Sequence, residues 1–310
     1  MAFNLTKKNN EVIKGTKIKT SIGEKIFSFV NYTFFILLGM ATLFPFLNLV
    51  AKSFSSEAAV ISGKVGLWPV DFQLGTYEFV LGNKQFINSF FVTVIVTILG
   101  TLTGIIITVI TAYPLSKTRL RGRKGLLIIF VFTMLFNGGL IPTYLVMQKL
   151  NLVNNIWVLI LPAMINVFNL LIMKNYFESL PESIEESAKI DGASNLTILF
   201  RIILPLSKPV IATITLFFAV AHWNSYFQAM VYITDPQLKP MQLYLKELVS
   251  STADVLKQAG YNPDVEGALN TVPEAIQAAS IVAATIPIIL VYPFLQKYFV
   301  KGVLIGSVKG

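Results

Sequence analysis

The sequence lacks cysteine altogether and has a single histidine, His222, among its 310 residues. The absence of cysteine excludes disulfides, thiol chemistry and a Cys/His zinc site. Charged residues are also scarce, at 13% of the chain, whereas a soluble domain has about 25%. Hydrophobic residues make up 54% of the chain and the mean hydropathy is +0.67. The lipid bilayer is therefore expected to be the main solvent of this protein.

The usual signatures of a catalytic site are missing as well. The sequence has no Gly-x-x-x-x-Gly-Lys-Ser/Thr loop for nucleotide phosphates, no nucleophile elbow and no paired carboxylates. We therefore expect that the chain is not an enzyme, that it binds no cofactor or metal, and that it does not hydrolyse ATP by itself.

Six apolar stretches are long enough to cross a membrane, which takes about 20 residues. They are residues 26–50, 87–115, 126–146, 156–173, 210–233 and 275–295. We predict an all-α, multi-pass protein of the cell membrane with six transmembrane helices within residues 26–300.

The positive charges predict the orientation of these helices. Basic residues fill the leader 1–25 and the connection between the second and third stretches, where five of them occur without an acid. Lys and Arg collect in cytoplasmic loops, so both termini, including the tail 301–310, are predicted to be cytoplasmic. The loops 51–86 and 234–274 then lie outside. This placement also explains the net charge of +9 without a nucleic-acid partner.

The outer loop 234–274 is too long to be a simple connector. Its apolar residues from Leu243 to Val249 have a helix-like spacing, and a turn is predicted at 260–263. Such a loop is expected either to meet an extracellular partner or to cap the helix bundle.

Several predicted spans contain residues that interrupt a helix. Backbone freed by Gly or Pro inside lipid must be satisfied by protein or by water in a cavity, which favours helices packed around a pathway. Ordinary kinks and small-residue packing are the alternative for each position. The residues are Asn137, Gly138, Gly139, Pro142, Pro162, Asn166, Asn169, Pro287 and Pro293.

The most informative segment is the loop 178–205, predicted to be cytoplasmic. Ser179 and Glu182 have the spacing of a capping box, with Pro181 in the first turn of a short helix. Gly192 is placed to end this helix in the left-handed conformation. Ser194 or Asn195 then caps a second helix, 196–204, that Pro205 stops. We expect a bent pair of short helices whose small residues seat in a groove of a partner.

This loop resembles the EAA loop of bacterial ABC importer permeases. The resemblance rests on Glu186-x-Ala188-x-x-Asp191-Gly192-Ala193, with Ser187 at the second position, and on Ile202-Ile203-Leu204-Pro205. The sequence of the loop is similar to that of the carbohydrate branch of this family, the MalG-like permeases. Further matches are Ile141-Pro142-Thr143-Tyr144, Leu159-Ile160-Leu161-Pro162, Trp223-Asn224-Ser225-Tyr226 and the C-terminal run 297–310, which resembles the subgroup typified by LplC and YtcP.

The resemblance implies a MetI-like permease core with one additional N-terminal helix. It implies a second, MalF-like permease as heterodimer partner, two ATPase subunits that use ATP and Mg and dock on the EAA loop, and an extracellular solute-binding protein. The implied ATPase-coupling residues are Glu186, Ser187, Ala188, Asp191, Gly192, Ala193, Ile203 and Pro205. The tail, with Lys301 and Lys309, is implied to reach the ATPases, and loop 234–274 to enter the binding protein.

Polar and aromatic residues near the end of the fifth stretch are candidates for the translocation path: His222, Trp223, Asn224 and Tyr226. Aromatic faces with amide donors suit sugar rings, and polar groups within spans are often functional. Interhelical hydrogen bonds and anchoring at the interface are the alternative.

Three functions remain open at this point. The favoured one is import of a carbohydrate, for which the family resemblance implies an oligosaccharide, driven by partner ATPases through alternating access. The second is the same machinery with another solute, such as a peptide or amino acid. The third is an autonomous channel or proton-coupled carrier, against which no carboxylate falls within the six predicted spans.

Overall fold

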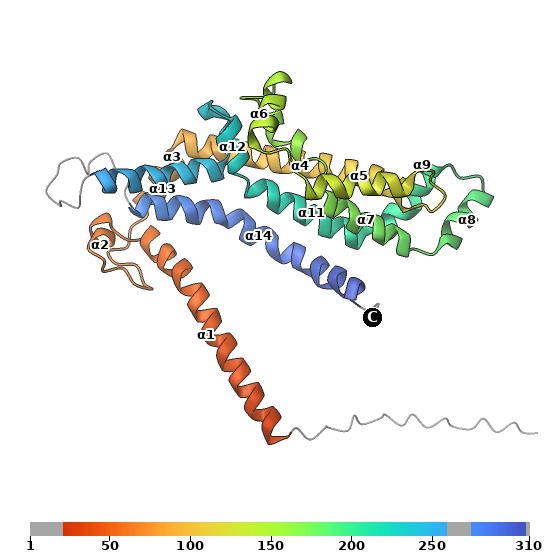
Figure 1. Ribbon diagram of the computed structural model, residues 1–310. Coiled ribbons are helices and arrows are strands. Elements are labelled where there is room, and N and C mark those ends of the chain that lie inside the picture. The colour runs from red at the N-terminus through yellow and green to blue at the C-terminus, as the bar shows by residue number, and fades with distance from the viewer. Residues whose placement is uncertain (1–20, 259–273, 308–310) are drawn as a thin grey trace, which may run out of the picture. The chain divides into compact units, whose positions relative to one another are not determined.

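The computed structural model describes residues 21–258 and 274–307, which contain helices and no strand (Figure 1). The chain divides into two units, residues 1–48 and 49–310. The described part of the first unit is one long apolar helix, α1 (Ile22–Ser53), whose last turn belongs to the second unit. Its length and hydropathy are sufficient to cross a membrane.

The second unit contains helices of very different lengths. In chain order they are α2 (Glu57–Ile61), α3 (Gly75–Gly82), α4 (Lys84–Ser116), α5 (Arg123–Leu135), α6 (Leu140–Lys149), the 3₁₀ turns η1 (Ile156–Leu159) and η2 (Leu161–Ala163), α7 (Val167–Ser179), α8 (Glu182–Ile190), α9 (Asn195–Ile198), the π-helix η3 (Leu199–Ile203), α10 (Leu204–Leu206), α11 (Lys208–Trp223), α12 (Phe227–Tyr232), the 3₁₀ turn η4 (Pro236–Leu238), α13 (Met241–Gln258) and α14 (Glu274–Ser307).

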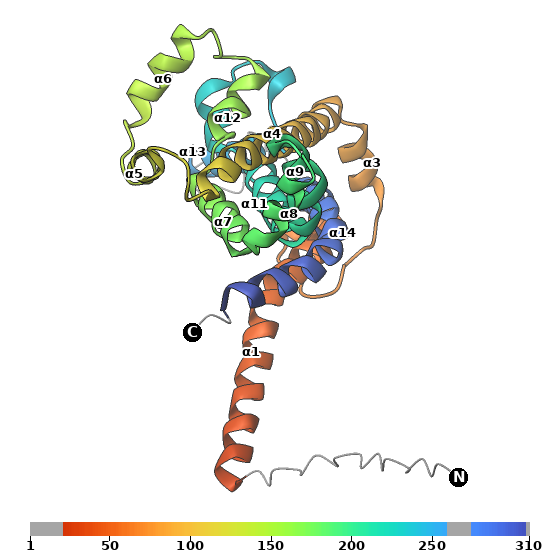
Figure 2. The same ribbon diagram turned by 90° about the vertical axis from the view of Figure 1, so that its right-hand side faces the viewer.

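Helix α4 is the centre of a bundle in this unit. It packs against α7 and α11, and α14 packs against α11. Helices α8 and α9 lie at one end of the bundle, and α2, α3 and α13 lie at the other (Figure 1). The view along the bundle shows α5 and α6 to one side of it (Figure 2).

Three predicted spans are single helices, and three are not. Helices α1, α4 and the Glu274–Val291 part of α14 match the first, second and sixth predictions. The predicted spans 126–146, 156–173 and 210–233 are each broken into shorter helices. The first breaks between α5 and α6 with a bend of 111°, and the second between η2 and α7 with a bend of 45°. The third is interrupted at residues 224–226, between α11 and α12.

The break between α5 and α6 has a local cause. Gly139 has a φ of +90°, which L side chains rarely adopt. The backbone N–H of Gly139 donates a hydrogen bond of 2.9 Å to the Asn137 Oδ1, which stabilises the turn. With each bent pair counted as one span, up to six spans fit the described helices.

The packing of α4 on α11 depends on two glycines. A Cβ atom on Gly100 would lie 2.4 Å from the His222 Nε2, and one on Gly104 would lie 2.8 Å from the Phe218 ring. Gly100 and Gly104 form a G-x-x-x-G motif, which lets two helix backbones approach closely in a membrane. The motif is visible in the sequence.

The end of the bundle that carries α2, α3 and α13 is folded rather than loop-like. The Glu57 carboxylate accepts hydrogen bonds of 2.9 and 3.0 Å from the backbone N–H groups of Glu274 and Ala275, and so caps α14. The helix predicted around Leu243–Val249 is confirmed as part of α13. The turn predicted at 260–263 lies outside the described residues.

Candidate coupling loop and solute pocket

The loop 178–205 forms a bent pair of short helices, as predicted. Gly192 follows α8 with a φ of +79°, and the Ser194 hydroxyl accepts the Thr197 N–H at 3.2 Å to cap α9. The predicted capping box is wrong, because Pro181 is the N-cap of α8 and the Ser179 hydroxyl donates to the Tyr176 carbonyl instead. Residues 178–205, which include α8, α9 and η3, are called the coupling loop below.

Pro205 does not stop the second helix. The helical backbone continues through the π-helix Leu199–Ile203 and Pro205 to Leu206, where the chain bends by 83° into α11. A proline ring collides with the carbonyl four residues earlier and has no N–H to donate. The wider π turn, in which the Leu204 N–H bonds to the Leu199 carbonyl, is well suited to accommodate both effects.

The side chains of the coupling loop divide into an inward and an outward group. Ala188 and Ile203 are buried in the chain's own core, and Ala193 packs against it. Ala188 and Ala193 therefore bring the loop close to its own bundle, which corrects the expectation that these two residues face a partner, whereas Gly192 is exposed. Glu186, Ser187, Asp191, Gly192 and Pro205 are exposed.

Three large apolar residues of the coupling loop face away from the bundle. The exposed fraction is 86% for Ile190, 68% for Leu196 and 57% for Phe200. Sequence reasoning missed this apolar surface, although Ile190 and Leu196 flank the Gly192 bend. The signal was a pair of large apolar residues on either side of a predicted bend.

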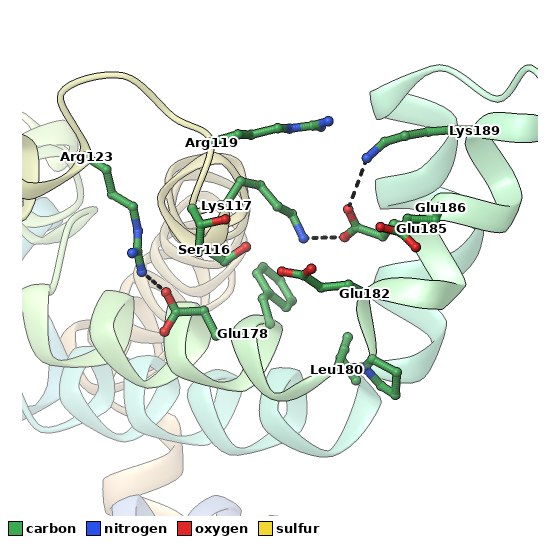
Figure 3. A pocket seen from close by; sticks show the side chains of 13 residues that line it. Ser116, Lys117, Arg119, Arg123, Glu178, Leu180, Glu182, Glu185, Glu186 and Lys189 are labelled. Carbon is green, nitrogen blue, oxygen red and sulfur yellow. Dashed lines mark hydrogen bonds and ion pairs between the residues drawn. The ribbon is translucent and has the colours of Figure 1, made fainter.

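A charged cavity of about 380 Å³ lies between the coupling loop and the connection from α4 to α5 (Figure 3). Lys117 pairs with Glu185, Arg123 pairs with Glu178, and the Lys189 Nζ lies 3.9 Å from the second Glu185 oxygen. Glu182 and Glu186 also line the cavity. Opposite charges from separate helices thus meet at this end of the bundle.

A second cavity, of about 760 Å³, lies where α11 ends and α12 begins. Its polar lining consists of amides, hydroxyls and one imidazole, and none of the described residues that line it is a lysine, arginine or carboxylate. Phe168 and Phe217 line its wall with ring centroids 6.5 Å apart. The amide residues are Asn166, Asn169, Asn224 and Gln228. This cavity is called the solute pocket below.

The structure brings three of the four predicted path residues to the solute pocket. His222, Asn224 and Tyr226 line it, together with Asn166 and Asn169, which the sequence analysis singled out as helix interruptions. Trp223 does not line it; its ring meets the Phe90 ring of α4 edge to face at 6.2 Å. Successive residues of a helix point in different directions, so four consecutive candidates do not share one cavity. Phe168, Phe217 and Gln228 were missed.

The last two candidate residues lie in the C-terminal tail. Lys301 belongs to helix α14, and Lys309 lies outside the described residues. Within residues 21–258 and 274–307, no group of three or more His, Asp or Glu side chains is arranged to hold a metal ion.

Comparison with known proteins gives consistent matches along nearly the whole chain. Residues 21–305 match the family model of the binding-protein-dependent transport system inner membrane component. The polygalacturonan/rhamnogalacturonan transport system permease protein YtcP of Bacillus subtilis is 44% identical over 92% of this chain and 99% of its own length. Protein LplC of the same organism is 45% identical over 92% and 96%.

A solved structure agrees with these matches. A chain of a bacterial ABC transporter involved in the import of the acidic polysaccharide alginate superposes with a TM-score of 0.82 at 41% identity, over 90% of this chain and 99% of that chain. From these matches, the chain belongs to the family of binding-protein-dependent transport system inner membrane components.

Proposed function

We propose that this multi-pass membrane protein is a permease subunit of an ATP-driven importer for carbohydrate, and that its solute is an acidic oligosaccharide. The observation that carries the proposal is the likeness, along nearly the whole chain, to a permease named for polygalacturonan and rhamnogalacturonan and to an importer of alginate. Both polygalacturonan and alginate are polymers of uronic acids. A peptide or amino-acid solute finds no support among these relatives.

The coupling loop is the proposed docking site for the ATPase. Ile190, Leu196 and Phe200 form an exposed apolar surface beyond the spanning helices, and such a surface favours contact with a partner protein. Glu186 and Asp191 are exposed beside it and are available for basic groups of that partner. The excess of Lys and Arg in the α4–α5 connection supports a cytoplasmic location for this end of the bundle.

The rest of the assembly follows from the same proposal. ATP and Mg are bound and consumed by two separate ATPase subunits, because this sequence has no phosphate-binding loop. A second permease completes the pathway as a heterodimer. An extracellular binding protein delivers the solute to the opposite end of the bundle, where α2, α3 and α13 lie. The C-terminal tail 301–310, with Lys301 and Lys309, is the proposed second contact with the ATPases.

The solute pocket is the proposed contribution of this chain to the translocation path. Its volume of about 760 Å³ lies in the range of ligand sites, about 300–1,000 Å³. Aromatic side chains such as Phe168 and Tyr226 offer apolar faces to sugar rings, while the Asn and Gln amides offer donors and acceptors to hydroxyl groups. A lining without fixed charge binds weakly enough to let the solute pass.

Transport by the reconstituted complex tests the proposal. The chain is assembled in vesicles with its partner permease, ATPase and binding protein, and uptake of labelled oligogalacturonate is compared with uptake of a neutral oligosaccharide and a peptide. We expect ATP-dependent uptake of the acidic oligosaccharide. Uptake of the peptide alone, or equal uptake without the ATPase, would refute the proposal.

A further inference from the structure

The connection between α4 and α5 contacts three separate parts of the coupling-loop region. The Lys117 Nζ pairs with Glu185 on α8, the Arg119 guanidinium donates to the Asn195 Oδ1 of α9 at 3.3 Å, and Arg123 pairs with Glu178 near the end of α7. Figure 3 shows Lys117 and Arg123 pointing toward their carboxylates from the opposite side of the cavity. Residues 117–123 are called the connector below.

The ion pair at Glu185 is shielded from solvent. The exposed fraction of the side chain is 9% for Glu185 and 20% for Lys117. The Lys117 Nζ also lies 4.8 Å from the centre of the Tyr113 ring. Among the described residues, Glu185 is the only carboxylate that is buried. Exposed ion pairs contribute little to stability, whereas removing one member of a buried pair leaves an uncompensated charge and costs more.

Arg123 fixes the ends of three helices at once. Its Nε donates a 2.8 Å hydrogen bond to the Leu115 carbonyl near the end of α4, while its guanidinium pairs with Glu178 of α7 and its backbone begins α5. The Lys174 Nζ holds the other Glu178 oxygen at 2.7 Å. Between these charges, Leu120 packs on the core cluster that contains Ile198 and Leu199. The connector is therefore held against the coupling loop by ion pairs and by apolar contact.

We propose that the connector is a transmission element, which carries movements of the coupling loop to α4 and α5. The inference rests on the proposed function of the coupling loop. Without the connector, a displaced coupling loop would pull only on its covalent neighbours α7 and α11. With it, the displacement also reaches α4 through Lys117 and α5 through Arg123. Lys117 and Arg123 are positioning residues in this scheme, because they contact neither solute nor nucleotide.

The route along α4 ends at the solute pocket. Sixteen residues separate Ser116 from Gly100, which is about 24 Å of helix at 1.5 Å per residue. At that point His222 lies directly against Gly100, and Phe218 lies against Gly104. His222 and Phe218 both line the solute pocket. Because these contacts leave no space for even a methyl group, a shift of α4 along its axis displaces the pocket wall.

The decisive measurement is the amount of solute moved per ATP hydrolysed by the complete reconstituted complex. We expect Glu185→Gln and Lys117→Met each to lower this ratio about fivefold or more, the lower range of coupling between distant sites. ATPase co-purification and the rate of ATP hydrolysis should stay near those of the unmodified complex. The charge-reversed double variant, Lys117→Glu with Glu185→Lys, should recover much of the ratio. Glu182→Gln, which removes an exposed acid from the same helix and cavity, is the matched control.

A cross-link within the folded complex keeps the test valid if a single variant assembles poorly. The chain has no cysteine, so a short thiol-specific cross-linker can join Lys117→Cys with Glu185→Cys without reacting elsewhere in this chain. We expect a low ratio before cross-linking and a higher ratio after it in the same sample.

Two results would overturn the inference. One is a normal ratio in both single variants, and the other is a ratio in the cysteine pair that cross-linking does not change. In either case the unmodified complex would still transport the acidic oligosaccharide, so the proposed function would stand. Failure of the unmodified complex to transport any oligosaccharide would instead refute the proposed function.

Discussion

The charged cavity at the coupling loop and the solute pocket differ in how their polar groups are used. The cavity at the coupling loop is lined by Lys, Arg and Glu side chains that pair across it, whereas the solute pocket has amides, hydroxyls and aromatic rings and no fixed charge among its described lining residues. Paired charges hold segments in one relative position. Neutral polar groups can exchange hydrogen bonds with a passing solute. On the proposed function, the paired charges hold the coupling loop to the bundle, and the neutral lining of the solute pocket accommodates the solute.

The largest effect is expected from a substitution that forces α4 away from α11. Gly100→Val would place its Cβ 2.4 Å from the His222 ring, and overpacking of this kind costs about 1–3 kcal/mol or more. We expect the variant to lower the unfolding temperature of the purified complex and to abolish uptake. Gly125→Ala is the control, because a Cβ there meets nothing within 4 Å. Normal stability of Gly100→Val would contradict the close packing.

The bend of the coupling loop gives the second largest effect. Gly192 has a φ of +79°, while the space around it is open. Gly192→Val should therefore fail through backbone strain of about 1–2 kcal/mol, with reduced ATPase co-purification and uptake. Gly192→Asn also adds a side chain, but asparagine tolerates this backbone conformation, so this variant should transport nearly normally. Equal loss in both variants would show that side-chain volume matters rather than φ.

The apolar surface of the coupling loop should show a moderate effect confined to docking. Phe200→Ser removes a side chain that is 57% exposed, so the fold should be unaffected. If the ATPase buries this side chain, binding should weaken by about 1.5–3 kcal/mol, measured as the affinity of the ATPase for the permease pair in detergent. Ile61→Ser, on an equally apolar residue that is 72% exposed in α2, should leave that affinity unchanged. A similar loss in both variants would argue against a specific docking surface.

The smallest effect is expected at the solute pocket, where it tests whether the lining residues contact the solute. Tyr226→Ala should raise the solute concentration for half-maximal uptake about tenfold or less, as expected for one aromatic contact, without changing basal ATP hydrolysis. Trp223→Phe is the paired control, since Trp223 meets Phe90 and does not line the pocket. Uptake that depends on Trp223 and not on Tyr226 would place the path on the other side of α11.

Much of the fold was predictable from local chemistry. The helical class, the six apolar stretches and the left-handed Gly192 follow from hydropathy and from the conformational freedom of glycine, which are properties of short segments. The breaks at 137–139 and 164–166 lie at or beside Asn, Gly and Pro residues that were visible in the sequence, but the break at 224–226 was not predicted. The 111° angle between α5 and α6 is a property of the folded chain, and hydropathy alone does not contain that information.

The candidate sites were predictable in part. The coupling residues were found through a motif, and His222, Asn224 and Tyr226 through their types and position. The sequence did not reveal that Ala188 faces inward, that Ile190 and Phe200 face outward, or that Trp223 turns toward Phe90. Those outcomes depend on the rotation of each short helix about its axis, which distant residues decide.

The amino-acid sequence alone was enough to identify a membrane protein of six apolar stretches with a bent coupling loop. Composition and local backbone preference are properties of short segments, so they can be read without the fold. The side-chain contacts became known from the tertiary structure. Lys117 and Glu185 are 68 positions apart, and Gly100 and His222 are farther apart still. Such contacts arise when helices pack, since close packing and charge pairing act across space rather than along the chain.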